Sequence, residues 1–376
     1  MKQFFLAIAC AVASLGNAQD STKNGDGPYV FYTDEGIEAV TIENGVAQTK
    51  KIDPRGDRAI NIAFPGHTDW NFSVTLRHKL ANEPSNYSQP SKLFAISDIE
   101  GEFEAFRSLL INNKIVDDQY HWIFGEGSLV ICGDLFDRGK EVVQELWLLY
   151  KLEDEARAAH GYVHTILGNH DIMNLSGDTR YVEPFYFADA AVMGKKYGDL
   201  YSKKTELGRW LRTKNIVERI GDNLCLHAGV SPIINSLVSS LNQAPEMINS
   251  LCRPYYDRAQ EDEVIVAAGV YPYFGENGLF WFRGYFTGQR ETMRGVDSTL
   301  IGFHCRRIIV GHTILTRNPA MYYGGKVIGI DVNEHQGDRA GILYIDKKWW
   351  RTDGDGNQIE LVYRPNNDQI GQGQAN

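Results

Sequence analysis

The stretch Ile131-Cys132-Gly133-Asp134-Leu135-Phe136-Asp137-Arg138-Gly139 decides how the rest of this 376-residue chain is interpreted. The apolar run that leads into it, residues 128–132, predicts a buried strand, and Gly133 lets the backbone turn sharply where that strand ends. The turn delivers two carboxylates and a guanidinium into one cleft, where Asp134 is suited to bridge a pair of metal ions. Taken alone, the same residues also fit a turn whose Asp side chains cap a helix.

Four further segments follow the same rule of an apolar run, a turn and an oxygen or nitrogen ligand. These segments are residues 94–101, 165–171, 224–229 and 308–313, and their ligands are Asp98, Asn169, His227 and His312. Carboxylates can bridge two cations, whereas amide and imidazole groups complete the two coordination shells. Together with Asp134, these strand ends predict a dinuclear metal site.

The series of motifs resembles the calcineurin-like metallophosphoesterases, and among them the phosphoprotein-phosphatase branch with its Gly-Asp-x-x-Asp-Arg-Gly block. It is most similar to the bacterial Shelph-type protein phosphatases, which share the Trp-x-Arg-Gly-Tyr found at residues 281–285. The resemblance covers roughly residues 92–331. It implies the α/β (in some schemes α+β) metallophosphoesterase fold, a four-layer α/β/β/α sandwich.

Residues 1–18 predict a signal peptide, because Lys2 precedes an apolar core at residues 4–15 and small residues follow. We therefore expect export to the periplasm or the medium, with lipidation at Cys10 as the less favoured alternative. The apolar core is shorter than the roughly 20 residues of a membrane span, so no transmembrane segment is expected. Residues 19–27 are polar and Gly-rich and predict a flexible tether.

Beyond the tether, the alternation of short apolar runs and turns predicts a small β-rich appendage over residues 28–81 and a linker over residues 82–91. The catalytic domain is expected to span residues 92–364. Within it, residues 172–222 are rich in aromatics and Arg and predict a helical cap insertion over the metals. Residues 365–376 predict a disordered tail.

Composition limits the function classes. Hydrophobic residues make up 43% and charged residues 23% of the chain, as in ordinary globular proteins, and the formal net charge is −10. An acidic chain without a long basic run is a poor nucleic-acid binder, so no nucleic-acid partner is expected. We expect buried free thiols at Cys132 and Cys225, while a disulfide between Cys252 and Cys305 stays open.

Within the metal site, we assign Asp134 as the bridge and Asp98 and Glu100 as ligands of the first metal. The second metal is assigned to Asn169, His227 and His312. Asp331 ends a further apolar run and is interpreted as a turn residue, with a position next to the metal ligands as the alternative.

The resemblance also implies roles around the metals. His170 would protonate the leaving oxygen, with Asp137 holding its ring in the required tautomer. A packed or metal-ligating His170 is the alternative. Arg138 and Arg283 are the candidates for forked contacts with the phosphate oxygens, which suit a planar guanidinium.

The chain departs from the family pattern at Glu100, where the first block of the family has His. Three carboxylates on the first metal make a hard, anionic shell, so among divalent ions we expect Mn, with Mg, Zn or Fe as alternatives. A weak or vacant first site also stays open.

The function predicted from these observations is an exported, metal-dependent phosphomonoesterase that hydrolyses phosphate esters with metal-activated hydroxide. The resemblance implies a protein phosphatase acting on Ser/Thr or Tyr, with a phosphorylated protein or small phosphomonoester as substrate. One alternative is a nucleotidase or dinucleoside-polyphosphate hydrolase on the same centre. Another is a non-catalytic cell-surface binding protein whose metal site has decayed. The sequence does not indicate an oligomeric state.

Overall fold

Two mixed six-stranded sheets form the centre of the protein, seen in a computed structural model that describes residues 25–241 and 244–369. The first sheet has the order β17 (Gln358–Glu360), β16 (Lys348–Asp353), β15 (Ala340–Ile345), β7 (Lys92–Ile96), β8 (Ser128–Cys132), β9 (Tyr162–Ile166). The second has the order β13 (Ala320–Tyr322), β14 (Val327–Gly329), β12 (Arg307–Val310), β11 (Asn223–Leu226), β10 (Val217–Ile220), β6 (Asn86–Tyr87).

The two sheets pack face to face through one apolar cluster. It includes Leu93, Val130 and Ile166 of the first sheet and Cys225, Ile309 and Ile328 of the second. Strands β7, β8 and β9 run parallel, as do β11, β12 and β14. Because parallel strands end at the same edge of a sheet, the loops that follow them come together there.

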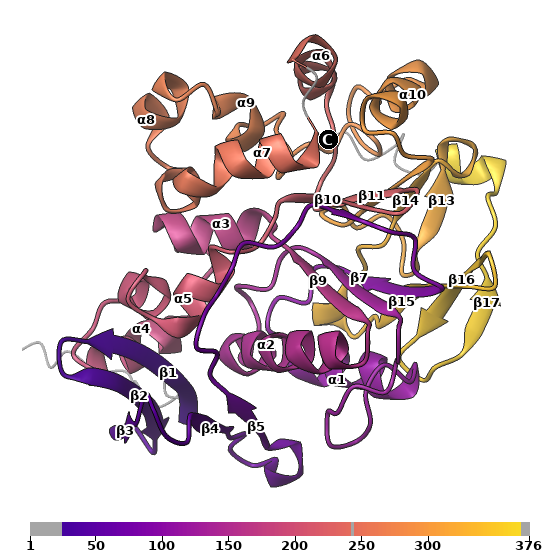
Figure 1. Ribbon diagram of the computed structural model, residues 1–376. Coiled ribbons are helices and arrows are strands. Elements are labelled where there is room, and N and C mark those ends of the chain that lie inside the picture. The colour runs from indigo at the N-terminus through magenta and orange to yellow at the C-terminus, as the bar shows by residue number, and fades with distance from the viewer. Residues whose placement is uncertain (1–24, 242–243, 370–376) are drawn as a thin grey trace, which may run out of the picture.

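Helices cover the outer face of each sheet, as Figure 1 shows. On the first sheet lie α1 (Phe103–Asn112) and α2 (Val142–Ala158), and on the second α6 (Pro232–Leu241), α7 (Pro245–Cys252) and α10 (Met293–Gly302). Two short helices, α8 (Asp262–Ala267) and α9 (Tyr271–Phe274), extend the second layer. The predicted α/β/β/α sandwich is confirmed.

The N-terminal β unit consists of an antiparallel sheet, β1 (Gly25–Thr33), β2 (Gly36–Glu43) and β3 (Val46–Ile52), and a hairpin of β4 (Ala59–Ile62) and β5 (Phe72–Thr75). It is anchored on α2, where Trp147 Nε1 donates to the Pro28 carbonyl at 2.8 Å. Because β1 begins at Gly25, the tether predicted over residues 19–27 is too long at its C-terminal end. The signal peptide predicted over residues 1–18 lies outside the described residues.

The predicted linker, residues 82–91, is part of the fold rather than a spacer. Its residues Asn86 and Tyr87 form β6 and pair in parallel with Arg219 and Ile220 at the edge of the second sheet. Two residues are too few to show a periodic pattern, so the sequence did not reveal this strand.

The insertion over residues 172–222, predicted as a helical cap over the metals, consists of short helices joined by loops, and most of it lies away from the cavity. It contains most of α3 (Asn169–Ser176), then α4 (Pro184–Val192) and α5 (Glu206–Leu211), and it ends in β10. Of these residues, Tyr181 alone lines the cavity described below. The others are held elsewhere: the Tyr186 hydroxyl accepts from the Val142 amide at 3.2 Å, and α4 and α5 lie beside β1 in Figure 1.

The start of the tail is ordered, contrary to the prediction of disorder over residues 365–376. Pro365–Gln369 form a 3₁₀ turn, η6. Its Asp368 accepts hydrogen bonds from the Tyr323 amide at 2.8 Å and the Tyr363 hydroxyl at 2.6 Å. Residues 370–376 lie outside the described part of the chain.

All four cysteines of the described residues are free. Cys132 and Cys225 lie fully buried between the sheets, as predicted. The disulfide that the sequence left open between Cys252 and Cys305 is not formed.

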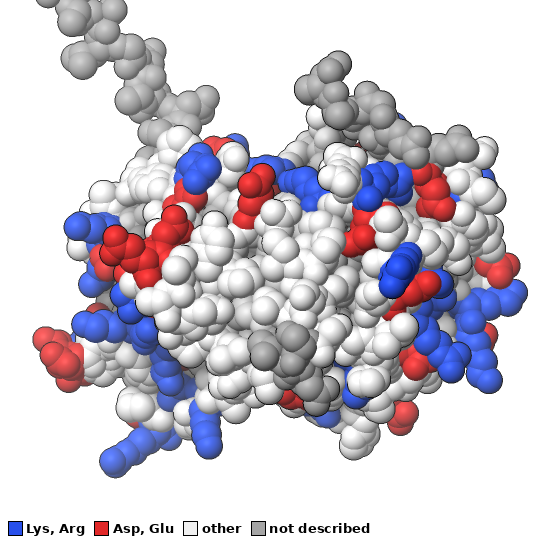
Figure 2. Space-filling model, turned by 90° about the horizontal axis from the view of Figure 1, so that it is seen from above, with Lys and Arg blue, Asp and Glu red and all other residues white. Residues whose placement is uncertain are grey.

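The surface carries charges of both signs. Figure 2 looks onto the layer of α6 to α10, where Lys and Arg side chains alternate with Asp and Glu along the margins. No helix among the described residues combines the length and apolar character needed to span a membrane.

A buried ion network joins the linker to the catalytic domain. Glu153 of α2 accepts from Lys214 Nζ at 2.6 Å, Arg77 Nη1 at 2.8 Å and Trp210 Nε1 at 3.0 Å. Lys214, only 1% exposed, also lies 3.0 Å from Glu83. The contacts of Lys214 with Glu153 and Glu83, and of Arg77 with Glu153, pair charges that would otherwise be costly to bury.

We expect Glu153→Gln to lower the free energy of unfolding by about 3 kcal/mol, because it leaves Lys214 and Arg77 with fewer compensating charges in the interior. Urea denaturation followed by tryptophan fluorescence measures the loss. Glu35→Gln is the matched control, since the Glu35–Lys51 pair is exposed on both sides. Equal midpoints for the two variants would contradict the assignment.

Candidate metal centre

The predicted ligands meet at the edge where both sheets end. Asp98 follows β7, Asp134 follows β8, Asn169 begins α3 directly after β9, and His227 and His312 follow β11 and β12. They surround a cavity of about 340 Å³, with His227 fully buried beneath it. The lining from the predicted site is Asp98, Glu100, Asp134, Arg138, Asn169, His170, Arg283 and His312.

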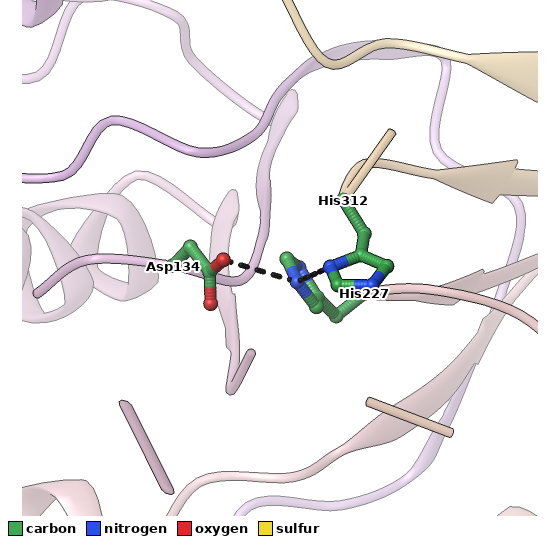
Figure 3. A group of neighbouring side chains, drawn as sticks. All are labelled: Asp134, His227 and His312. Carbon is green, nitrogen blue, oxygen red and sulfur yellow. Dashed lines mark hydrogen bonds and ion pairs between the residues drawn. The ribbon is translucent and has the colours of Figure 1, made fainter. Parts of the chain in front are cut away.

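The predicted second-metal ligands converge on one point. His227 Nε2 lies 3.1 Å from Asp134 Oδ2, 3.1 Å from His312 Nδ1 and 2.8 Å from Asn169 Oδ1. Figure 3 shows His227 between Asp134 and His312, with its ring nitrogen directed at both. His227 Nδ1 donates to the Cys132 carbonyl at 2.8 Å, which fixes Nε2 as the atom free to bind a cation.

The carboxylates predicted for the first metal line the same cavity as Asp134. Asp98 Oδ2 accepts from the His312 amide at 3.0 Å, and Glu100 is 3% exposed. Burial, followed by the neighbouring carboxylates of Asp134 and Glu100, raises the pKa of Asp98 to about 7 despite the proximity of His227. Carboxylates this close and this buried repel one another unless a cation lies among them.

The donor set fits divalent cations. Asp134, His227 and His312 offer donor atoms within 4.8 Å of one another, and so do Glu100, Asp134 and His170. Asp134 belongs to both groups, as expected of a shared ligand. Within the described part of the chain, His312 Nε2 and one oxygen of Asp331 are buried without a hydrogen-bond partner.

His170 is held by a second carboxylate. Its Nδ1 lies 2.6 Å from Asp137 Oδ2, and Asn174 Nδ2 donates to the other Asp137 oxygen at 2.9 Å. Burial opposes the charged imidazole, but Asp134 and the hydrogen bond to Asp137 outweigh it and raise the pKa of His170 to about 9. The Nε2 side of the ring is 3.7 Å from Glu100 and 4.0 Å from Asp134, so a metal-ligating His170 also fits the geometry.

Both predicted arginines reach the cavity. Arg138 Nη1 donates to Glu100 Oε2 at 2.7 Å, with 42% of its side chain exposed. Arg283 Nη1 donates to the His312 carbonyl at 2.5 Å and to Thr313 Oγ1 at 3.3 Å. Each guanidinium is thus anchored beside the ligands through one nitrogen.

The backbone of the site is strained. Asp98, Glu100, Asp134 and His312 have φ values of 54°, 49°, 55° and 65°, in the left-handed region that costs non-glycine residues energy. Two glycines make room for them: a Cβ at Gly168 would lie 2.1 Å from Asp134 Oδ1, and one at Gly133 would lie 2.6 Å from His227 Nδ1. Such strain collects where function requires a particular side-chain direction.

Sequence reasoning missed one side of the cavity. Asp331, Glu334 and His335 follow β14 and line it, with His335 in the 3₁₀ turn η5 (Glu334–Gln336). Asp331 obeys the strand-end rule used for the predicted ligands, and a position next to them was the less favoured alternative to a turn residue. Nothing in the local sequence singles out His335. Two aromatic rings, Tyr181 and Trp281, also line the cavity.

Residues 91–315 match the calcineurin-like phosphoesterase family. The chain belongs to this family. It is therefore a phosphoesterase, in a family that uses divalent metals. The matched residues contain every predicted metal ligand and catalytic residue, while Asp331 and His335 lie beyond them.

The chain is similar to Shewanella-like protein phosphatase 2 of Arabidopsis thaliana, with 27% identity over 69% of this chain and 75% of that protein. The structure is similar to the cold-active protein-tyrosine phosphatase of a psychrophilic Shewanella species, with a TM-score of 0.80 and 31% identity, over 90% of this chain and 100% of that one. The symmetrical bis(5'-nucleosyl)-tetraphosphatase of Methylococcus capsulatus matches less of the chain, 47%, at 27% identity over 51% of its own length.

We expect Asp134→Asn to lose bound metal, because an amide cannot supply the charge that two donor groups share. Wild type dialysed against Mn²⁺ should retain about two ions per chain, and the variant less than one. Elemental analysis after gel filtration measures both, with Asp117→Asn on an exposed turn as control. Unchanged metal content in Asp134→Asn would exclude Asp134 as the shared ligand.

Proposed function

We propose that this protein is a metal-dependent phosphomonoesterase with a dinuclear centre, acting on phosphorylated proteins. The observation that carries the proposal is the sharing of Asp134 between two donor groups in a cavity that also holds His170 and two arginines. Asp98 and Glu100 would hold the first cation, and Asn169, His227 and His312 the second. Mn²⁺ suits the carboxylate-rich first group best.

Divalent cations bound there would neutralise phosphoryl oxygens and make a water molecule acidic enough to attack near neutral pH. The chain's own groups account for the rest of the reaction. Arg138 and Arg283, which both line the cavity, orient the phosphate through their remaining N–H groups. His170 holds a proton on Nε2 for the leaving oxygen, while Asp137 accepts from Nδ1 and keeps the ring in that orientation.

We propose phosphotyrosine as the preferred residue. Tyr181 lies beside His170, with ring centroids 5.1 Å apart, and Trp281 lies beside His312 at 5.9 Å. Aromatic rings at the mouth of the cavity suit the phenyl ring of a phosphotyrosine better than the short side chain of a phosphoserine. The name of the similar Shewanella structure, a protein-tyrosine phosphatase, agrees with this preference.

A nucleotidase or dinucleoside-polyphosphate hydrolase is the second candidate, favoured by the partial match to a bis(5'-nucleosyl)-tetraphosphatase. A non-catalytic centre that has decayed through the change at Glu100 is the third candidate. The presence of the other predicted ligands argues against it: Asp98, Asp134, Asn169, His227 and His312. We further propose that the protein is exported, on the basis of Lys2, the apolar run at residues 4–15 and the small residues that follow.

With Mn²⁺ present, we expect kcat/KM for a phosphotyrosyl peptide to exceed that for the matched phosphoseryl peptide by about tenfold, the contribution of favourable ring contacts. A malachite green assay over both peptides, AMP and a dinucleoside tetraphosphate measures the ranking. Replacing Tyr181 by Ala should reduce the preference. If the dinucleoside tetraphosphate ranks first, the second candidate replaces the proposal.

His170→Ala should slow the hydrolysis of alkyl phosphates by about 100-fold, because a poor leaving group needs the proton. Nitrophenyl phosphate, whose leaving group is stable as an anion, should be slowed far less. Rates for both substrates, together with the metal content of the variant, test the assignment. Equal losses for the two esters would count against a general acid and for a ligand role.

A further inference from the structure

Glu100 is the proposed metal ligand at which this chain departs from the family pattern. Its two carboxylate oxygens have different neighbours. Oε2 accepts from Arg138 Nη1 at 2.7 Å and lies 2.7 Å from His335 Nε2. The other oxygen, Oε1, is the one that lies nearest His170 Nε2, at 3.7 Å. One oxygen is thus occupied by protein donors and the other faces the shared donor group of Glu100, Asp134 and His170.

His335 is held at both ends. While Nε2 contacts Glu100, Nδ1 lies 2.8 Å from Glu102 Oε1. With both ring nitrogens engaged by carboxylates, His335 has no nitrogen left for a cation in this arrangement. His335 would therefore support the proposed ligand Glu100 without binding the cation itself, although it lines the same cavity.

Arg138 is the more exposed of the two donors to Glu100 Oε2. Its side chain is 42% exposed, whereas that of His335 is 23% exposed and spans two residues of the loop after β7. If Arg138 turns toward a phosphate, His335 is the donor that stays on Oε2. A carboxylate fixed through one oxygen presents the other in a single direction, which is how neighbouring groups orient metal ligands.

We propose that His335 is a positioning residue for the first metal: it fixes Glu100 through Oε2, so that Glu100 binds the cation through Oε1. The inference rests on the metal centre of the proposed function and does not depend on the identity of the substrate. It assigns a role to the connection between β14 and β15, which lies outside the residues that match the family.

Isothermal titration of the metal-free protein with Mn²⁺ tests the proposal without reference to activity. His335→Ala should weaken the binding of one of two Mn²⁺ ions by about tenfold, as loss of a ligand's supporting hydrogen bond does. His335→Gln, whose amide can still donate to Glu100, should lie within about threefold of wild type. His121→Ala, in which an exposed histidine paired with Asp117 is lost, is the matched control.

A double-mutant cycle sharpens the test. In a Glu100→His background the carboxylate that His335 Nε2 contacts is gone, and only the contact of Nδ1 with Glu102 remains. Adding His335→Ala should then change Mn²⁺ affinity by less than about twofold. If wild type binds two ions and His335→Ala binds them with unchanged affinity, the inference is wrong while the proposed function stands. If wild type binds no Mn²⁺, both are wrong. A tenfold effect of His335→Ala that persists in the Glu100→His background would show that His335 acts independently of Glu100, and would also overturn the inference.

Discussion

The approach of Asp134 Oδ2 to His227 Nε2, 3.1 Å apart, is the contact on which the site depends, because the two residues belong to different sheets. It forms only if β8 and β11 stack with their ends aligned. The Cys132 carbonyl, one residue from Gly133, accepts from His227 Nδ1 and thereby links the first sheet to the same imidazole. The packing of the two sheets therefore also determines the distances between the donor atoms. A shift of either sheet would separate these atoms.

The protein sustains an unfavourable arrangement at this edge. Buried carboxylates face one another, and several ligand residues have left-handed backbone conformations. Strain and like-charge repulsion of this kind persist only where the surroundings hold the loops in place. Asp171 contributes here: its carboxylate accepts from the amides of Gly168 at 2.6 Å and Leu135 at 2.8 Å, tying the loop after β9 to the loop after β8. The largely buried strands behind the loops supply the compensating stability.

The meeting of the predicted ligands at one edge of the sheets could be foreseen from the sequence, because each of them follows an apolar strand and a turn. Strand β8 has the bounds expected from its apolar run. What could not be predicted depends on distant contacts. The contact between His335 and Glu100 joins positions 235 residues apart, and β6 is only two residues long. The insertion packs on β1 through aromatic side chains, and in the sequence these aromatics were interpreted as part of a cap. The ordered start of the tail likewise depends on Asp368 reaching Tyr323.

Under the proposed function, Glu100 would connect the two tasks of the site, metal binding and phosphate binding. Its Oε2 receives both Arg138, which lines the cavity with part of its side chain exposed, and His335, which is tethered at both ring nitrogens. In the proposed function, a phosphate that drew Arg138 away would remove one donor from this oxygen and leave the other. The carboxylate would keep its direction while its charge became less compensated, which would strengthen its attraction for a cation. A neutral histidine at this position could not respond in that way, because an imidazole carries no negative charge.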